Sequence, residues 1–361
     1  MNTWGNTLKL SIFGQSHGEA VGIVIDGLPA GETVDEALIA RDMKRRAPGR
    51  DDVSTARSET DAVDIVSGLY LGKTAGSPVC GLIYNRDARS SDYGTKLRPG
   101  HADWTALLKH GGHADMRGGG HFSGRLTAPL VFAGSIAKQL LDMRGIEIFA
   151  RIAAIGEVSD PKPPETKEAF GQLAGREFPA VSEQHMRQCI LDAKAQGDSV
   201  GGIVEAAAFG VPGGLGEPFF GSMESVIASM LFSIPAVKGV EFGDGFALAA
   251  MRGSEANDAL CIDVPPDAAT PADIIADTNH SGGILGGITN GMPLVVRAAV
   301  KPTPSIAKRQ RTVDAAGLGN AELSIDGRHD PCIVPRAVPV IEAALALCLL
   351  DSLLTDGRLW K

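Results

Sequence analysis

Four of the chain's eight histidines fall between Arg98 and Arg125, in the stretch RPGHADWTALLKHGGHADMRGGGHFSGR. Imidazole, glycine and arginine gathered in one stretch suit metal ligation, phosphate binding or proton transfer. Metal ligation fits least, because the two glycines between His110 and His113 do not hold helical geometry and no cysteine is nearby. We therefore expect no metal site here.

Phosphate binding fits the glycines better. Arg117 is followed by three glycines, whose consecutive unhindered N–H groups beside a guanidinium form a natural cradle for an anion. Ser123 and Arg125 follow where a helix is expected to begin, and the positive end of that helix would add to the attraction. The sequence contains neither GxxxxGK[ST] nor GxGxxG, so kinase, ATPase and Rossmann interpretations lose support.

Two histidines are placed for acid/base work. His17 lies in SHG just after an apolar strand, and His101 follows Pro99 and Gly100 in a turn. Imidazole titrates near neutrality and can donate or accept a proton, although a histidine hydrogen-bonded in a loop is the alternative for either one. A stronger indication of a site is GRHDPCIVPR, just ahead of the last expected helix, with four charged or titratable residues: Arg328, His329, Asp330 and Arg336.

The elements that must position these residues alternate without a strict βαβ rhythm, which favours an α+β arrangement of sheets packed on helices over a Rossmann fold. Hydrophobic periodicity predicts strands at 8–13, 22–29, 62–72, 77–85, 148–158 and 294–302. It predicts helices at 33–47, 124–143, 183–196, 222–232 and 336–354. Thr33, with Glu36 three residues on, is the expected N-cap of the first helix.

A weak internal sequence repeat suggests that residues 1–361 form one pseudo-symmetric domain. VGIVIDGLPAG at 21–31 resembles GGIVEAAAFGVPGG at 201–214, and each is followed by a helical stretch, which gives repeat units of about 21–50 and 201–235. Chance similarity between apolar strands is the alternative. No low-complexity linker divides the chain.

The net charge limits the classes of partner that are expected, and the cysteine content indicates the compartment. A formal net charge of −9 gives no general attraction to nucleic acid or anionic membranes, so neither is expected as a partner. The five cysteines are scattered, with no CxxC pair, which indicates reduced thiols in the cytoplasm. The apolar stretch AVPVIEAALALCLL is shorter than a membrane span and contains Glu342, so it predicts a buried helix. Together the residues predict a soluble α/β enzyme that binds a phosphorylated small molecule and uses histidines for proton transfer.

Seven motifs, in order along the chain, resemble the chorismate synthase family: FGQSHG, RPGHAD, DMRGGGHFSGR, IPAVKGVEFGDGF, GGILGGITNGMP, KPTPS and GRHDP. The resemblance implies a lyase that converts 5-enolpyruvylshikimate 3-phosphate to chorismate and phosphate with reduced FMN. It also implies a β-α-β sandwich and a homotetramer, and it leaves open NADPH as the reductant of the flavin.

The resemblance also implies roles for individual residues. His17 and His101 would be the acid/base pair, His101 near the flavin ring and His17 near the departing phosphate, and Asp330 would help to handle the proton at flavin N5. The residues implied to hold the flavin are His121, Phe122, Ser123, Ala236, Gly286, Lys301, Pro302, Thr303, Pro304, Ser305 and Arg328. Those implied to bind the anionic groups of the substrate are Arg45, Arg46, Arg125 and Arg336.

The sequence departs from the commoner family pattern in two places. His121 and Phe122 stand where Arg-Ser is more usual, and Asp51 and Asp52 stand where an arginine is more usual, which bears on NADPH binding.

Two other classes of function are to be tested against the lyase. One is a protein that binds a phosphorylated shikimate-like ligand or flavin without turnover, and the other is a metal-dependent phosphohydrolase.

Overall fold

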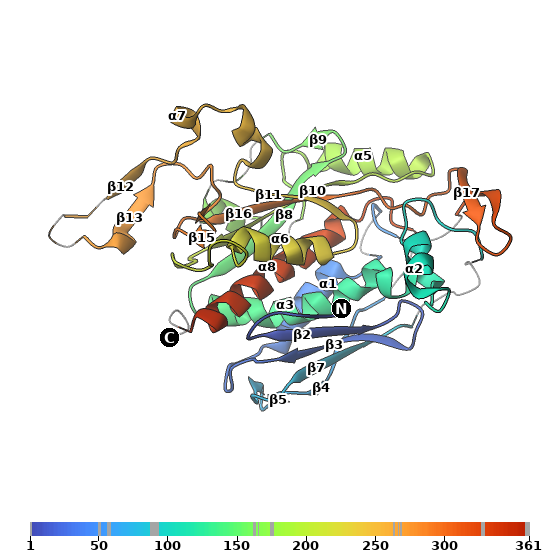
Figure 1. Cartoon of the computed structure of the whole chain (residues 1–361), viewed down its shortest axis with the longest axis horizontal. Helices are drawn as coiled ribbons and strands as arrows, with labels where there is room; N and C mark the ends of the chain where they lie inside the picture. Colours follow the sequence, from blue (N-terminus) through green and yellow to red (C-terminus); the bar gives the residue numbers. More distant parts are fainter. Residues whose placement is uncertain are drawn as a thin grey trace.

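Two antiparallel sheets enclose a layer of helices in the computed structural model (Figure 1). The structure describes residues 2–49, 52–55, 59–86, 94–161, 164, 166–173, 177–262, 264–265, 267, 269–325 and 329–357. This architecture confirms the expected α+β class and the β-α-β sandwich. A right-handed parallel βαβ unit is not used in either sheet, since each neighbouring pair of their described strands is antiparallel.

The first sheet carries the turn that contains His17. Its strands are hydrogen-bonded in the order β1 Thr3–Trp4, β2 Lys9–Gly14, β3 Ala20–Asp26, β7 Val79–Tyr84 and β4 Asp64–Ser67. Strands β2 and β3 form a hairpin in which Gly14 pairs with Val21, so the residues between them make a turn at the end of the sheet. Val21, Ile23 and Ile25 alternate along β3 and are buried, as the period of two predicts for the face that meets the helices.

The helical layer is closely packed. Its members are α1 Glu36–Arg46, α3 Thr127–Asp142, α6 Met223–Ser233 and α8 Val334–Asp356. Helix α3 crosses α8 at Gly134, where a Cβ atom would lie 2.2 Å from the Cβ of Ala343. Helix α8 is longer than the sequence indicated. Among the described helices, it is the one long and apolar enough to cross a membrane, judged by length and composition. However, 89% of its most apolar window is buried inside the protein. Its burial between the sheets confirms the expected core helix.

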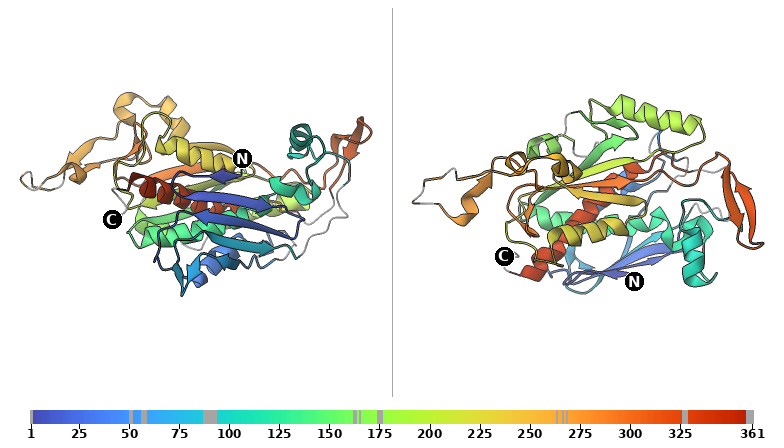
Figure 2. Two further views of the ribbon diagram at one scale, coloured as in Figure 1. Left: turned by 60° about the horizontal axis from the view of Figure 1, so that its bottom comes forward. Right: turned by 45° about the horizontal axis from the view of Figure 1, so that its top comes forward.

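The second sheet lies on the other side of the helices (Figure 2). Its strands follow the order β11 Val237–Phe242, β16 Leu294–Val300, β10 Gly202–Phe209, β8 Glu147–Ile155 and β9 Val158–Ser159. Helices α4 Lys167–Gly171 and α5 Glu183–Ala195 pack against β8. In the two stretches of the sequence repeat β3 leads to α1 and β10 leads to α6, so both have the same element order; a common origin stays a prediction.

Extensions project from both ends of the sandwich (Figure 1). At one end are α2 Asp103–His110 and the hairpin of β17 Gln310–Asp314 with β18 Gly319–Leu323. At the other end is an arm made of α7 Gly253–Ala256, β12 Leu260–Ile262 and β13 Ile274–Ala276. The remaining short strands are β5 Leu69–Tyr70, β6 Lys73–Thr74, β14 Ile284–Leu285 and β15 Ile288–Thr289.

The predicted elements are present, with one wrong cap and several missed elements, among them strand β11 of the second sheet. Asp35, not Thr33, caps α1, because its side chain accepts a hydrogen bond from the Ala37 N–H at 2.8 Å while Thr33 forms a bridge with Lys73. Helix α2 and the hairpins β12–β13 and β17–β18 were not expected. No disulfide joins the five cysteines, all of which lie in described segments.

Candidate active site

The glycine run at 118–120 brings the two predicted catalytic histidines together. All three glycines have positive φ angles, of 61°, 86° and 53°, which side chains rarely adopt. A Cβ atom at Gly118 would lie 2.4 Å from Nε2 of His17, and one at Gly119 would lie 3.0 Å from Nε2 of His101. The absence of side chains therefore lets both imidazole rings lie against consecutive residues of one loop.

The His17 turn is held from two sides. The side-chain amide of Asn85, just after β7, donates hydrogen bonds to the carbonyls of Gln15 at 3.0 Å and Gly18 at 2.8 Å. From the other side, the Ser16 N–H donates to the Gly120 carbonyl at 3.0 Å. These bonds fix the backbone on both sides of His17 and tie it to the glycine run.

His101 is held by a carboxylate and a guanidinium from its own segment. Its Nδ1 lies 2.7 Å from Oδ1 of Asp103, and the same carboxylate pairs with Arg98 at 2.7 and 2.8 Å. Burial alone would raise the pKa of Asp103, but hydrogen bonds from His101 and Arg98 outweigh it and hold that pKa well below its usual range. The carboxylate is therefore ionised at neutral pH.

Two of the predicted substrate-binding arginines share one buried acid. Asp61 accepts Arg46 on one carboxylate oxygen, at 2.7 Å, and Arg125 on the other. Burial would raise the pKa of Asp61, but the charges of Arg46 and Arg125 lower it below its ordinary value. Arg125 also donates to Oδ1 of Asn85 at 2.9 Å, which links the ion pairs of Asp61 to the His17 turn.

Asp330 and Arg336 lie on the other side of Arg46. Their side chains form an ion pair, and Arg336 Nε donates to the Arg46 carbonyl at 3.0 Å. The second oxygen of Asp330 accepts the Thr55 N–H at 3.0 Å. The predicted proton-handling carboxylate is thus joined to two of the predicted substrate arginines, and their roles stay predictions.

Arg45 is engaged elsewhere in the helical layer. Its guanidinium makes paired hydrogen bonds to Glu342 at 2.7 and 2.9 Å and a further one to Glu177 at 3.3 Å. Each of the four predicted substrate arginines therefore has an internal acidic partner in this structure: Glu342, Asp61 or Asp330.

The segment from Lys301 to Ser305, which was predicted to hold the flavin, lies against the His101 turn. Lys301 donates from Nζ to the Gly100 carbonyl, and a Cβ atom at Gly100 would lie 3.5 Å from the Cβ of Pro304. Ala236 joins the same group, because its carbonyl accepts the Lys301 N–H at 2.9 Å and its own φ is 75°, unusual for a residue other than glycine. Pro302 and Thr303 continue the segment.

The three predicted flavin residues after the glycine run differ in what they contact. The ring nitrogens of His121 lie 2.9 Å from the Gly14 carbonyl and 3.1 Å from Oδ1 of Asn2. The ring of Phe122 lies 6.1 Å from that of His110, between centroids. The Ser123 hydroxyl accepts the Arg125 N–H at 3.3 Å, at the start of the turn that leads into α3.

One predicted flavin residue, Gly286, is not brought to this group. Gly286 lies in the turn between β14 and β15, at the end of the molecule that carries the arm (Figure 1), whereas His101 directly precedes α2 at the opposite end. Arg328 lies outside the described residues, as does Asp51. Asp52 is described and pairs with Arg187 of α5 at 3.3 Å.

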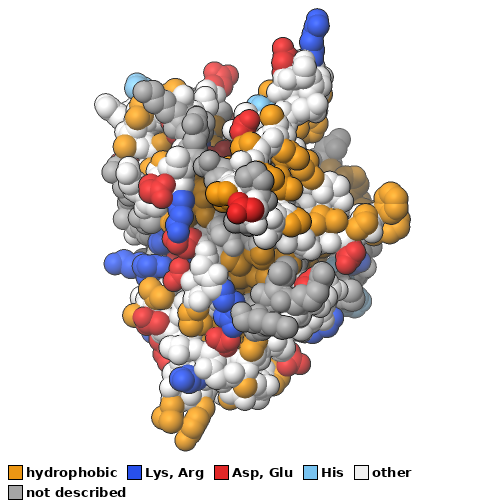
Figure 3. Space-filling model, turned by 90° about the vertical axis from the view of Figure 1, so that its left-hand side faces the viewer, with side chains coloured by type: hydrophobic (Ala, Val, Ile, Leu, Met, Phe, Trp, Pro, Cys, Tyr) orange, Lys and Arg blue, Asp and Glu red, His pale blue; other side chains and the backbone are white. Residues whose placement is uncertain are grey.

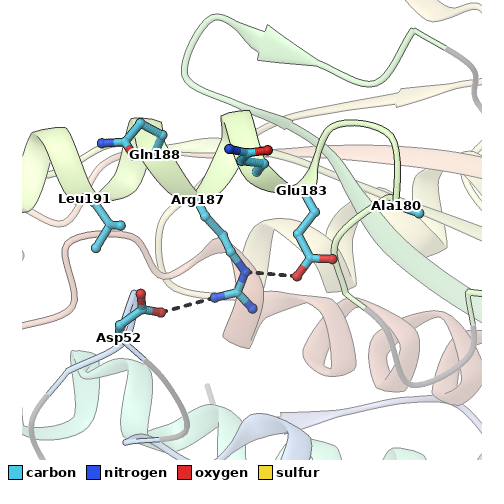
Figure 4. A pocket seen from close by; sticks show the side chains of 7 residues that line it. Asp52, Ala180, Glu183, Arg187, Gln188 and Leu191 are labelled. Atoms are coloured by element: carbon cyan, nitrogen blue, oxygen red, sulfur yellow. Dashed lines mark hydrogen bonds and ion pairs between the residues drawn. The ribbon is translucent and has the colours of Figure 1, made fainter.

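That ion pair borders an open hollow of about 440 Å³ on α5 (Figure 4), whose lining residues include neither His17 nor His101. Arg187 also contacts Glu183 at 2.9 Å, so its charge is shared between two carboxylates. No group of three or more potential metal ligands occurs in the part of the chain that the structure describes.

Four residues of this site were not predicted from the sequence: Asn85, Arg98, Asp61 and Asp103. The spacing of His101 and Asp103 in GHAD was a usable signal, because neighbouring residues on a turn can hydrogen-bond through side chains. Asn85 and Asp61 gave no local signal, since both contact residues distant in sequence: Asn85 contacts the His17 turn and Arg125, and Asp61 contacts Arg46 and Arg125.

Comparison with known proteins shows to which family this chain belongs. A sequence model of the family described as chorismate synthase matches residues 8–354. The chain belongs to the chorismate synthase family. It is 47% identical to "Chorismate synthase" of Aeropyrum pernix over 97% of this chain and 92% of the relative, and 47% identical to that of Thermococcus kodakarensis over 99% and 98%.

The fold agrees with the family. A solved structure titled "Crystal Structure of Chorismate Synthase" superposes with a TM-score of 0.76 at 29% identity, covering 98% of this chain and 93% of the other. Membership of the chorismate synthase family makes the protein a carbon–oxygen lyase of the shikimate pathway, which leads to the aromatic amino acids.

Proposed function

We propose that this protein converts 5-enolpyruvylshikimate 3-phosphate to chorismate and phosphate by 1,4-elimination, with reduced FMN as cofactor and His17 and His101 as its acid/base pair. The single observation that supports these roles is the contact of both rings with consecutive glycines, Gly118 and Gly119. Two imidazoles that lie against one loop can serve two proton transfers on one small substrate.

The residues near His101 fit a phosphate-bearing flavin. The Thr303 hydroxyl oxygen is buried and has no hydrogen-bond partner among the described residues, so a ligand could supply one. Lys301 places a cation in the same segment, next to Gly100. Lys301 to Ser305, Ala236 and Ser123 would hold the cofactor, with Phe122 as an apolar contact.

When bound, reduced FMN would supply reversible one-electron transfer and a basic N5 for the non-acidic ring hydrogen, with the electron returned as the diene forms, so that the elimination is redox-neutral overall. His17 would protonate the departing phosphate, and His101 would hold or move a proton beside the flavin. Asp330, held by its ion pair with Arg336, would accept or return the proton at flavin N5. Arg46, Arg125 and Arg336 would bind the phosphate and carboxylates once the substrate competes for their present acidic partners.

A homotetramer in the cytoplasm completes the proposal. Phe219, Phe220 and Phe246 are at least 85% exposed at the arm end, which suits burial against other copies of the chain. Figure 3 looks at this end and shows hydrophobic side chains spread across it. Because Gly286 lies at this end, its predicted flavin contact would be made to the site of a second copy.

One assay separates this function from its rivals. The protein is incubated anaerobically with the enolpyruvyl substrate and photoreduced FMN, in the presence of a chelator. We expect chorismate and phosphate in equal amounts, with no reductant consumed per turnover. Tight binding without turnover would identify a non-catalytic binder, and phosphate release that the chelator abolishes would identify a metal-dependent phosphohydrolase. Replacing photoreduction by NADPH tests whether the protein reduces its own flavin.

A further inference from the structure

We propose that Asp103, clamped by Arg98, is a positioning residue that fixes His101 in the tautomer with its proton on Nδ1 and leaves Nε2 as the working nitrogen. The inference rests on the acid/base role proposed for His101. It adds how the chain decides which of the two ring nitrogens carries out that role.

Four donors converge on the two oxygens of Asp103. Oδ2 accepts the backbone N–H of Arg98 at 2.9 Å and its Nε–H at 2.8 Å. Oδ1 lies 2.7 Å from the terminal nitrogen of Arg98 and 2.7 Å from Nδ1 of His101. An ionised carboxylate only accepts hydrogen bonds, so the Nδ1 atom of His101 must be the donor in this contact.

A competing contact with Arg98 does not reverse this assignment. A terminal nitrogen of Arg98 also lies 3.2 Å from Nδ1 of His101, but its contact with Asp103 is shorter, at 2.7 Å. Arg98 and Asp103 together carry no net charge, so the pair orients the ring through directed hydrogen bonds.

The tautomer leaves Nε2 directed at the glycine run. Nε2 is the His101 atom nearest to the position of a Cβ on Gly119, at 3.0 Å. The Gly119 N–H donates to the Met116 carbonyl, also at 3.0 Å, and so is not committed to the imidazole. Nε2 can therefore accept a proton from a ligand bound over this loop.

Replacing Asp103 with Asn should reverse the tautomer. The asparagine has one acceptor oxygen, which is best placed where the two Arg98 donors meet Oδ2. Its NH2 group then faces His101, which can accept that hydrogen bond only with Nδ1 unprotonated and the proton on Nε2. The same logic explains why an aspartate-to-asparagine change leaves the catalytic histidine of serine proteases in the wrong tautomer.

The test is [15N]histidine NMR on the full-length protein at a pH where the ring is neutral, with the His101 signals assigned by their absence in His101→Ala. We expect the proton on Nδ1 in the wild type, on Nε2 in Asp103→Asn, and on both in exchange in Asp103→Ala. With turnover measured in parallel, kcat of Asp103→Asn should fall roughly 100-fold or more, with KM changed less than about threefold. Asp192→Asn on exposed α5 is the matched control and should change neither reading.

The outcomes separate this inference from the proposed function. A wild-type proton on Nε2, or an unchanged tautomer in both Asp103 variants, overturns the positioning role without any reference to activity. A reversed tautomer with wild-type kcat supports the positioning of the ring but overturns the acid/base role of His101. If Asp103→Asn fails to fold, the wild-type tautomer and Asp103→Ala still decide the question.

Discussion

The carboxylate of Glu342 binds both terminal nitrogens of Arg45, at 2.7 and 2.9 Å, and so joins α8 to α1 inside the helical layer. Lys138 of α3 reaches the same carboxylate at 2.9 Å. Three helices thus meet at one buried acid. We predict that Glu342→Gln lowers the free energy of unfolding by about 3–5 kcal/mol at pH 7, because it leaves two buried cations poorly compensated. Urea denaturation followed by circular dichroism measures this change.

The same acid predicts a pH dependence. Burial would raise the pKa of Glu342, but Lys138 and Arg45 lower it from 4.5 to about 2 in the folded protein. Its stabilisation is therefore complete above about pH 4.5 and is lost as the pH falls toward 2. The gap in unfolding free energy between wild type and Glu342→Gln should shrink by about 1.4 kcal/mol between pH 6 and pH 3.5. A gap that stays constant over this range would contradict the assignment.

A second prediction uses two glycines with similar backbone conformations. Gly118 and Gly111 have φ angles of 61° and 57°, but a Cβ would meet His17 at Gly118 and nothing within 4 Å at Gly111. Both alanine variants should lose about 1 kcal/mol of stability from the left-handed conformation. Only Gly118→Ala should also lower kcat, by about tenfold or more, because it displaces the His17 ring. Equal kcat values in the two variants would show that the contact is not needed.

The patterns that predicted the fold were those that depend on neighbours in sequence. Buried Val21, Ile23 and Ile25 show period two in β3, and the long apolar run marked α8, so the core elements followed from periodicity. The hairpins β12–β13 and β17–β18 were missed because they are exposed and carry little of that pattern. The expectation that Gly111 and Gly112 do not hold helical geometry is confirmed, because α2 ends at His110 and Gly111 is left-handed.

The site was only partly predictable for a related reason. His17 and His101 were found from their local turns and the family motifs, yet their meeting at Gly118 and Gly119 requires the folded loop. The acidic partners of the arginines gave no signal, because Asp61 is separated in sequence from both Arg46 and Arg125 and approaches them only when α1 packs beside α3. Pairing across the core is a property of tertiary structure, not of spacing along the chain.

Asn85 supplies a third prediction. Asn85→Asp keeps the oxygen that accepts Arg125 but loses the two donors that hold Gln15 and Gly18. The His17 turn should loosen, so we expect kcat to fall about tenfold while the circular dichroism spectrum is unchanged. Asn320→Asp, at an exposed position on β18, is the control for the added charge. A similar loss in both variants would point to charge and not to the turn.

The final prediction concerns His121, a residue at which we expect this chain to depart from the commoner family pattern. Both of its ring nitrogens face oxygens of the protein, the Gly14 carbonyl at 2.9 Å and Oδ1 of Asn2 at 3.1 Å. A nitrogen bonded to these groups is not directed at an anionic ligand, so we expect His121 to contribute little to the pH dependence of anion affinity. We therefore expect the same pH profile of FMN dissociation constants, measured by flavin fluorescence, in wild type and His121→Gln. His121→Arg should shift the whole curve but keep its slope. An affinity that weakens with rising pH in the wild type and not in His121→Gln would mean that the imidazole turns toward the ligand and binds it as a cation.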